Sequence, residues 1–414
     1  MLRPKIRLST LWIVLGLFSI HLTILVADEA QVWNQRGIEL LKEGDLVNAL
    51  SAFRRAQQAD PEDQTIRRNL SYAHAKRGIE NILAHRLDKG IAHLQKALLY
   101  CPTESRYNYW LGVGHYRKNN YFAAIVELKH VLEKMPEHAE SHEYLGYSYY
   151  HQGRIPLALK HWKQSIQFRP KNDNLKRWIL KAERELIVES DYESARSAHF
   201  TIRYDGKRAD LLARKVLNLL EDAHFEIGSV FRFYPKGPVE VVLYSEKDFR
   251  SVTRSHHWVG GLYDGKIRVA IRGWQTVESE LRGVIRHEYT HVLISKLAPN
   301  APAWLNEGLA QMLEGDEEAK IAQTIVVRAS RENKLLPWST LRIPFHQLKD
   351  TRQVEIAYAQ SESFVRWVAS RYGRPSFAGI LRKITDGVPL PEAFQKEYHQ
   401  KLEDLFSLWK ASLT

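Results

Sequence analysis

The chain has 414 residues, which is too long for one ordinary domain and fits two or three. Its apolar and charged contents are those of a globular protein, so wholesale disorder is not expected. The formal net charge is +12, but no dense basic block or nucleic-acid motif accompanies it, so no nucleic-acid partner is expected. The single cysteine, Cys101, excludes an intrachain disulfide and a cysteine-based zinc site.

Residues 1–27 have the features of an export segment. Arg3, Lys5 and Arg7 precede a mostly apolar run, Leu11–Ala27. The run is a little long for a cleaved signal peptide and slightly short for a spanning helix of about 20 residues, so a cleaved signal and a retained membrane anchor both stay open. In either case the positive charge before the run predicts that the rest of the chain lies outside the cytoplasm, in the periplasm or secreted.

Four prolines mark a repeat in the next part of the chain. Pro61, Pro102, Pro136 and Pro170 each end a predicted helical segment, and the last two intervals are both 34 residues, the period of the tetratricopeptide repeat. Small residues that allow close helix approach and large residues that fill the seam precede them at matching positions: Gly37, Phe53, Gly112, Leu128, Gly146 and Trp162. The segment from about residue 30 to residue 171 therefore resembles tetratricopeptide repeats. The resemblance implies an α-solenoid that docks a protein partner or peptide in its groove.

The second repeat is longer than the others. From Pro61 to Pro102 is 41 residues, seven more than the period. Seven residues are nearly two helical turns, so the helices of this repeat are expected to lengthen without rotating their apolar faces. A capping helix at about Asn174–Glu189 is predicted to cover the last repeat, which gives a solenoid domain at residues 30–190.

The pattern changes after this capping helix. The short polar stretch Ser190–Ala198 predicts a boundary to a second domain at residues 198–414. Alternating or β-branched segments predict strands, and a longer amphipathic segment predicts a helix. The strands are expected at His199–Tyr204, Val239–Tyr244 and Ile267–Ile271, and the helix at Ala209–Phe231. Because helices dominate from Glu278 onward, the chain is expected to be mostly α, an α-solenoid followed by an α+β domain.

The segment 287–291 reads H-E-Y-T-H. Residues four apart on a helix share a face, so His287 and His291 can reach one cation. Glu288 is rotated by about 100° and can lean over the open side of the metal, where water binds. Alone, this motif is a weak signal, and a helix with two solvated histidines is the alternative.

A second motif follows, and its glutamate, Glu307, lies 16 residues after His291. The segment 304–310 reads W-L-N-E-G-L-A, and Pro299 and Pro302 are expected to end one helix and start the next. The returning helix can place Glu307 against the two histidines. Catalytic zinc takes three protein ligands and keeps one open position, and this carboxylate would supply the third.

Together the two motifs resemble those of the gluzincin metallopeptidases, the group that includes thermolysin-like and aminopeptidase-N-like enzymes. The resemblance implies a zincin-type domain that holds Zn²⁺ through His287, His291 and Glu307, uses Glu288 as general base and hydrolyses a peptide or protein substrate. The G-x-M-E-N segment of aminopeptidase-N-like enzymes is absent from the sequence, so exopeptidase activity is not implied. An interaction scaffold with an inactive metallopeptidase-like domain stays open as the alternative.

Two further residues or segments are candidates for substrate chemistry. Gluzincins add a Tyr or His donor to the developing oxyanion, and Tyr358, near the start of the predicted helix Val354–Tyr372, is the candidate here. The alternative is a core tyrosine whose hydroxyl bonds to backbone. The strand Ile267–Ile271 could pair with extended substrate beside the metal, or could be an ordinary sheet edge.

Overall fold

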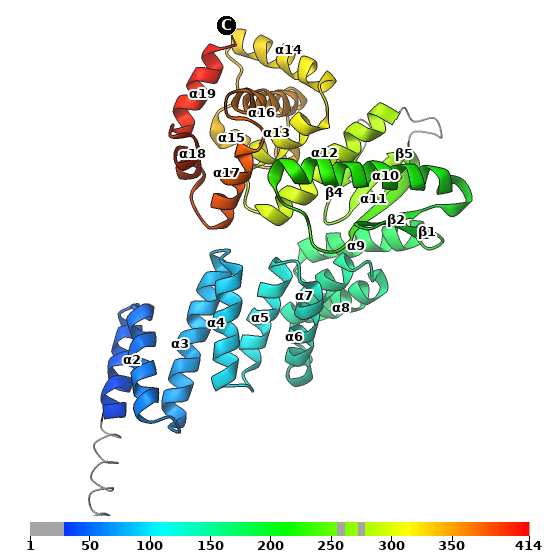
Figure 1. Cartoon of the computed structure of the whole chain (residues 1–414). Coiled ribbons are helices and arrows are strands. Elements are labelled where there is room, and N and C mark those ends of the chain that lie inside the picture. Colours follow the sequence, from blue (N-terminus) through cyan, green and yellow to red (C-terminus); the bar gives the residue numbers. More distant parts are fainter. Residues whose placement is uncertain (1–28, 255–260, 272–277, 414) are drawn as a thin grey trace, which may run out of the picture. The chain divides into compact units, whose positions relative to one another are not determined.

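The computed structural model describes residues 29–254, 261–271 and 278–413. The predicted export segment Leu11–Ala27 therefore lies outside the described residues. Within those residues, no helix combines the length and the apolar character needed to cross a bilayer. The structure is mostly helical, with a small sheet in the C-terminal part, as the sequence predicts (Figure 1).

The first compact unit of the chain, Met1–Ser148, is a series of paired helices. Its described elements are a helix over residues 29–42, α2 (Leu46–Ala59), α3 (Gln64–Leu83), α4 (Leu87–Tyr100), α5 (Ser105–Arg117), α6 (Tyr121–Lys134) and most of α7 (Ala139–His151). Glycine allows the close approach within two of these pairs. A Cβ atom on Gly37 would lie 2.5 Å from the ring of Phe53, and one on Gly112 would lie 2.8 Å from Leu128. The predicted tetratricopeptide-type solenoid is confirmed.

The extra residues of the second repeat lie in its first helix. Helix α3 has 20 residues, whereas the equivalent helices α5 and α7 have 13 each. The difference is seven residues, so the predicted lengthening is confirmed. Its buried side chains, among them Ile66, Leu70 and Ile82, still follow one face along the added turns.

The second compact unit, Tyr149–Thr414, begins at the end of α7. Its first elements are α8 (Ile155–Phe168), α9 (Asp173–Val188), β1 (Glu193–Arg196), β2 (Phe200–Tyr204), α10 (Gly206–Phe231), β3 (Val239–Ser245), α11 (Glu246–Thr253), β4 (Gly261–Tyr263) and β5 (Ile267–Ile271). Helix α9 matches the predicted capping helix, with each end displaced by one residue. The three predicted strands correspond to β2, β3 and β5.

The strands form one five-stranded sheet in the order β1-β2-β3-β5-β4. The central strands β2, β3 and β5 are parallel, and the outer strands β1 and β4 pair antiparallel with their neighbours. Strand β1 was not predicted, and it occupies part of the polar stretch 190–198 in which only a domain boundary was expected. Its side chains are mostly exposed, so it carries no apolar alternation that sequence reasoning could detect.

Helices cover both faces of this sheet. On one face, Val241, Leu243 and Val269 pack into the same core as α10 and α12 (Glu278–Leu297). On the other face, Val242 and Tyr244 pack with residues of α11 and with the C-terminal end of α9. Helix α9 therefore covers the sheet as well as ending the repeats. The two compact units divide the chain between Ser148 and Tyr149, and the domain bounds 30–190 and 198–414 stay a prediction.

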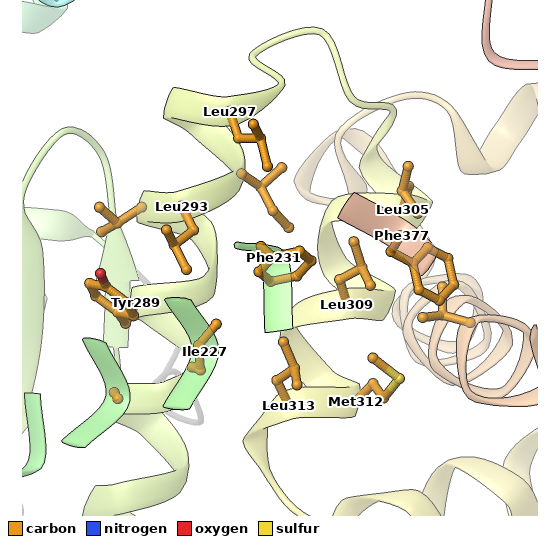
Figure 2. Close-up of a cluster of buried hydrophobic side chains, with 14 of the residues drawn as sticks. Ile227, Phe231, Tyr289, Leu293, Leu297, Leu305, Leu309, Met312, Leu313 and Phe377 are labelled. Carbon is orange, nitrogen blue, oxygen red and sulfur yellow. The ribbon is translucent and has the colours of Figure 1, made fainter. Parts of the chain in front are cut away.

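The remaining helices pack around α12 and α16. They are α13 (Ala303–Glu314), α14 (Glu317–Arg331), α15 (Trp338–Leu341), the 3₁₀ turn η1 (Phe345–Gln347), α16 (Thr351–Tyr372), α17 (Ser376–Thr385), α18 (Leu390–Tyr398) and α19 (Leu402–Ala411). Figure 2 shows Leu293 and Leu297 of α12 facing Leu305 and Leu309 of α13, with Phe231 at the end of α10 between the two helices. This apolar seam fixes the separation of α12 and α13.

A fragment that begins at residue 198 is expected to unfold at a temperature at least about 5 °C below a fragment that begins at residue 139. The shorter fragment lacks α7, α8, α9 and β1, so Val242 and Tyr244 lose part of their cover and β2 loses its antiparallel partner. Thermal denaturation followed by circular dichroism measures the difference. Equal melting temperatures would show that residues 198–414 fold independently of α9.

Candidate metal centre

Helix α12 presents two imidazole rings from one face. The helix ends at Leu297, shortly before Pro299, whose ring nitrogen has no hydrogen to donate to a further helical turn. His287 and His291 lie one turn apart, and their Nε2 atoms are 3.1 Å from each other. The opposite face is anchored by buried side chains such as Val292, so both rings project away from the core.

Helix α13 brings a carboxylate to these rings. It starts after Pro302 and runs alongside α12, with its apolar residues in the shared seam (Figure 2). Glu307, in the second turn of α13, is partly exposed. Its Oε2 atom lies 3.6 Å from His291 Nε2 and 3.9 Å from His287 Nε2. The structure therefore brings the three predicted ligands together, and their role as ligands stays a prediction.

The donor set fits a zinc ion. One ligand atom from each side chain can be chosen so that all three lie within 4.8 Å of one another, and within the described residues this is the one group of three or more such side chains. Two ligands held by tetrahedral zinc at 2.0–2.2 Å are separated by about 3.3–3.5 Å, close to the distances found here. The ligand side chains are 13–21% exposed, which leaves access for a water molecule or substrate. Two imidazoles and one carboxylate are a known catalytic zinc set.

Both histidines are oriented by contacts at their second ring nitrogen. His287 Nδ1 lies 2.7 Å from Glu314 Oε2, and His291 Nδ1 lies 3.1 Å from Asn306 Oδ1. A proton on each Nδ1 leaves each Nε2 lone pair free for a metal. Burial lowers the pKa of His287, but the hydrogen bond with Glu314 and the surrounding carboxylates outweigh it and raise that pKa to about 9. Burial lowers the pKa of His291.

Sequence reasoning did not identify these two supporting residues. Glu314 follows Glu307 by seven residues, which is two helical turns, so the two carboxylates share a face and the spacing was an available signal. Asn306 carries no such signal. Its contact with His291 depends on how α13 packs against α12, and that packing is set by residues far apart in the chain.

Glu288 lies beside the ligands and faces the sheet. Its side chain is buried, and its Oε2 atom makes no hydrogen bond with any described residue. Burial raises the pKa of Glu288 to about 8, against the opposing effect of charged His287. A bound cation would favour the ionised form instead. An unpartnered buried carboxylate oxygen is costly unless a ligand or water uses it, so Glu288 fits the predicted role of proton acceptor.

The strand nearest to Glu288 is β4. A Cβ atom on Gly261 would lie 2.7 Å from both Cγ and Oε1 of Glu288, so only glycine fits there without movement of the carboxylate. Strand β4 is at the edge of the described sheet, and β5 lies between β4 and β3. The predicted strand Ile267–Ile271 is therefore present but internal. The strand available for pairing with a substrate is Gly261–Tyr263.

Tyr358 is close enough to the site to interact with its carboxylates. Helix α16 crosses α13 at Gly308, where a Cβ atom would lie 2.5 Å from the backbone oxygen of Ser361. This contact brings the face shared by Ser361 and Tyr358 toward Glu307. Burial, followed by the negative charges of Glu307 and Glu288, raises the pKa of Tyr358, so its hydroxyl keeps its proton. Its ring packs against the core, edge-on to Phe345 at 5.0 Å, and its role as oxyanion donor stays a prediction.

Two family models match different parts of the chain. The family model described as Peptidase MA superfamily matches residues 226–414, which contain every site residue named above. The tetratricopeptide-repeat model matches residues 34–79 and 115–173. The interval between these two matches contains the end of the lengthened helix α3. No curated protein matches the chain.

Three of the similar solved structures each align with about a third of this chain. A structure titled MamA AMB-1 has 20% identity over 34% of this chain and 74% of its own, with a TM-score of 0.29. A second MamA crystal structure has 21% identity over 35% and 81%, with a TM-score of 0.29. YrrB, titled a tetratricopeptide-repeat protein with an unusual peptide-binding site, has 14% identity over 35% and 89%, with a TM-score of 0.26. Likenesses this low carry no functional argument. The family matches show that the chain carries tetratricopeptide repeats together with a Peptidase MA superfamily domain.

Proposed function

We propose that this protein is an exported zinc metallopeptidase whose repeats dock a protein or peptide. The observation that carries the proposal is the convergence of His287, His291 and Glu307 beside the buried Glu288, which has one oxygen without a described partner. The Peptidase MA superfamily match over the same residues supports it. Export rests on the charge and apolar pattern of residues 1–27, which lie outside the described residues.

The proposed ligands would be the Nε2 atoms of His287 and His291 and a carboxylate oxygen of Glu307. When bound, zinc supplies Lewis acidity, which makes a water molecule more acidic and polarises a substrate carbonyl. The chain's own contribution is to orient the ligands. Glu314 and Asn306 hold the two rings by their Nδ1 atoms, so neither ring can rotate freely.

Glu288 is the proposed proton carrier. Its free oxygen accepts a proton from the attacking water as the new C–O bond forms at the peptide carbonyl. When the C–N bond breaks, the same carboxyl donates that proton to the leaving amine. The proton is thus returned, and Glu288 is ready for another cycle. Its burial against Gly261 limits its movement between these two steps.

Two other elements would act on the substrate. The protonated hydroxyl of Tyr358 is a donor for the negative charge that develops on the carbonyl oxygen. The backbone of the edge strand Gly261–Tyr263 offers main-chain groups for an extended peptide beside Glu288. Strand β4 precedes the proposed ligands in the chain, and Tyr358 on α16 follows them. The proposed site therefore combines residues from β4, α12, α13 and α16.

The repeats supply a surface with clustered aromatic rings. Tyr116 packs edge-on against Tyr144 at 5.2 Å, and Tyr109 lies 6.2 Å from Tyr144, all within the first compact unit. Tetratricopeptide repeats are protein-interaction modules, and clustered tyrosines suit extended peptides. This cluster also favours the alternative of an inactive scaffold, which would use the repeats alone. Metal content separates the two functions, because a scaffold has no need of a bound ion.

The purified protein is expected to hold about one zinc ion per chain, by the coordination of the site. His287→Ala, His291→Ala and Glu307→Ala should each lose the metal, whereas Glu133→Ala, an exposed carboxylate in the repeats, should keep it.

Glu288→Gln should keep the metal but lower kcat on casein peptides by about 10²–10⁴-fold, because an amide cannot accept the proton. Elemental analysis and peptide cleavage with and without chelator measure both effects. A Glu288→Gln protein as fast as wild type would refute the mechanism.

Replacing a group that orients a ligand should weaken zinc binding without removing a ligand. Glu314→Gln and Asn306→Ala are each expected to raise the Kd for zinc by about 10–100-fold. Competition with a chromophoric chelator measures this Kd. Glu332→Gln, an exposed carboxylate on the same unit, is the matched control and should bind zinc as wild type does. Unchanged affinity in Glu314→Gln would mean that the contact with His287 has no part in metal binding.

Tyr358→Phe is expected to lower kcat by about 10²–10³-fold, the loss typical of one oxyanion donor. Zinc content and melting temperature should stay the same, because only one hydroxyl is removed. Tyr372→Phe is a control on the same helix, where the ring packs against Tyr398. If Tyr358→Phe turns over at the wild-type rate, or fails to fold, the donor must be sought elsewhere.

A further inference from the structure

A buried ionic cluster lies on the face of the sheet opposite to α12. We call it the Arg268 cluster, which comprises Arg268 with Asp264, Glu185, Tyr150 and Tyr244. The guanidinium of Arg268 is fully buried and donates to the Tyr244 hydroxyl at 2.5 Å and to the Tyr150 hydroxyl at 2.8 Å. It also donates to Glu185 at 2.9 Å and, through Nε, to both oxygens of Asp264 at 3.2 Å. These four partners lie in different parts of the fold: β3, α7, α9 and the turn between β4 and β5.

The partners join two regions of the second compact unit. Tyr150 is at the end of α7 and Glu185 is on α9, whereas Asp264 is in the turn between β4 and β5. Lys181 of α9 also forms an ion pair with Asp264, so the turn is held from two directions. Burial alone would raise the pKa of Asp264, but Arg268 and Lys181 lower it below its usual range. The turn therefore carries a fixed negative charge between two cations.

Further contacts press the same turn onto the end of α7. Gly265 has φ +104°, and a Cβ atom there would lie 2.5 Å from the ring of His151. Lys266 is buried, with its Nζ 4.8 Å from the centre of the Tyr150 ring and 3.9 Å from Glu185 Oε2. Glycine adopts this positive φ readily and leaves room for the His151 ring, whereas a buried lysine is unfavourable without such partners. The sequence around the turn is thus adapted to contact with α7 and α9.

The strand that leads into this turn is β4, the strand beside Glu288. Leu262 of β4 pairs in register with Arg268 of β5, so the cluster lies directly behind the middle of β4. On the other side, Gly261 touches Glu288, and the Tyr263 hydroxyl accepts a hydrogen bond from Ser295 of α12 at 3.1 Å. Strand β4 has only three residues, and little pairing of its own holds it in place. The position of β4 therefore depends on the Arg268 cluster on one face and on the contacts with α12 on the other.

We propose, resting on the peptidase function proposed above, that the Arg268 cluster positions β4 for substrate. The cluster fixes the turn at residues 264–265, and the turn fixes the edge on which an extended peptide would lie. Helix α9, which ends the repeats, is thereby part of the substrate-binding arrangement. Arg268, Asp264 and Glu185 are positioning residues, because none of them touches the ligand set.

Loss of the Arg268 cluster should weaken the binding of long substrates and leave the chemical step unchanged. The ligands and Glu288 lie on α12 and α13, which are held by the apolar seam on the opposite face of the sheet. Loosening the turn should leave these helices in place and displace β4. A peptide long enough to pair with β4 then binds less well, whereas a short substrate that engages only the metal centre is unaffected. A simple loss of folded protein would lower the rate on both substrates equally and leave KM unchanged.

The test uses the full zinc-loaded chain with Asp264→Asn or Glu185→Gln. Two quenched fluorescent peptides share one cleavage site, one of about ten residues and one shortened to about four. For the longer peptide, KM is expected to rise about tenfold with kcat within about twofold; for the shorter one, both should stay within about twofold. Glu397→Gln is the matched control, a carboxylate in the ion pair with Lys383 on the helices α17 and α18. Tyr150→Phe, which removes one hydroxyl, gives a milder variant if the others fail to fold.

Amide hydrogen exchange measures how firmly β4 is held, and it needs no catalytic activity. Exchange in residues 261–271 is expected to be at least about tenfold faster in Asp264→Asn than in wild type, with α12 as protected as before. Equal losses on both peptides, or unchanged exchange at β4, would overturn the positioning role. If the wild-type chain binds zinc but cleaves neither peptide, the proposed function fails. Local exchange at β4 then decides by itself whether the cluster holds the strand.

Discussion

The packing of α12 against α13 is the interaction on which the rest of the site depends. The three proposed ligand side chains come from two helices, so a displacement by one turn, about 5.4 Å, would remove Glu307 from both histidines. Each large apolar side chain in the seam, such as Leu293 and Leu309, contributes about 1.5–3 kcal/mol by its burial. That contribution offsets the cost of holding three polar ligand groups close together. The core thus positions the proposed ligands, and close packing at Gly308 brings α16 against α13.

Local patterns in the sequence were enough to predict most elements and the grouping of the ligands. The spacing of His287 and His291 needs only one helix, and the prolines before Glu307 indicate a helix that returns. The repeat period likewise predicted the solenoid, and the seven extra residues were found in α3. The histidine spacing, the returning helix and the repeat period all involve residues that are close in the chain, so the geometry of a helix was enough to predict them.

The features that escaped prediction depend on contacts between distant residues. Strand β1 is mostly exposed and shows no apolar alternation, and it exists because β2 offers an edge for pairing. The contact of Asn306 with His291 requires the packing of two helices. The charged residues Arg268 and Lys266 interrupt the apolar pattern of a central strand, and a sequence gives no sign that a carboxylate 83 residues earlier meets Arg268. Removing one partner of such a buried pair costs about 3–5 kcal/mol, a large share of the 5–15 kcal/mol that stabilises most proteins.

Helix α9 both ends the repeats and covers one face of the sheet, and this limits where the chain can be joined to a different repeat array. A chimera that joined a foreign repeat array at residue 190 would lack Tyr150 and Glu185, and the buried guanidinium of Arg268 would keep only Tyr244 and Asp264 of its partners. A crossover before Tyr149 would carry the whole polar set along with the sheet. The number and identity of the preceding repeats could then vary while the junction stayed constant. The last repeat and the Peptidase MA superfamily domain would therefore have to be exchanged together, as one unit.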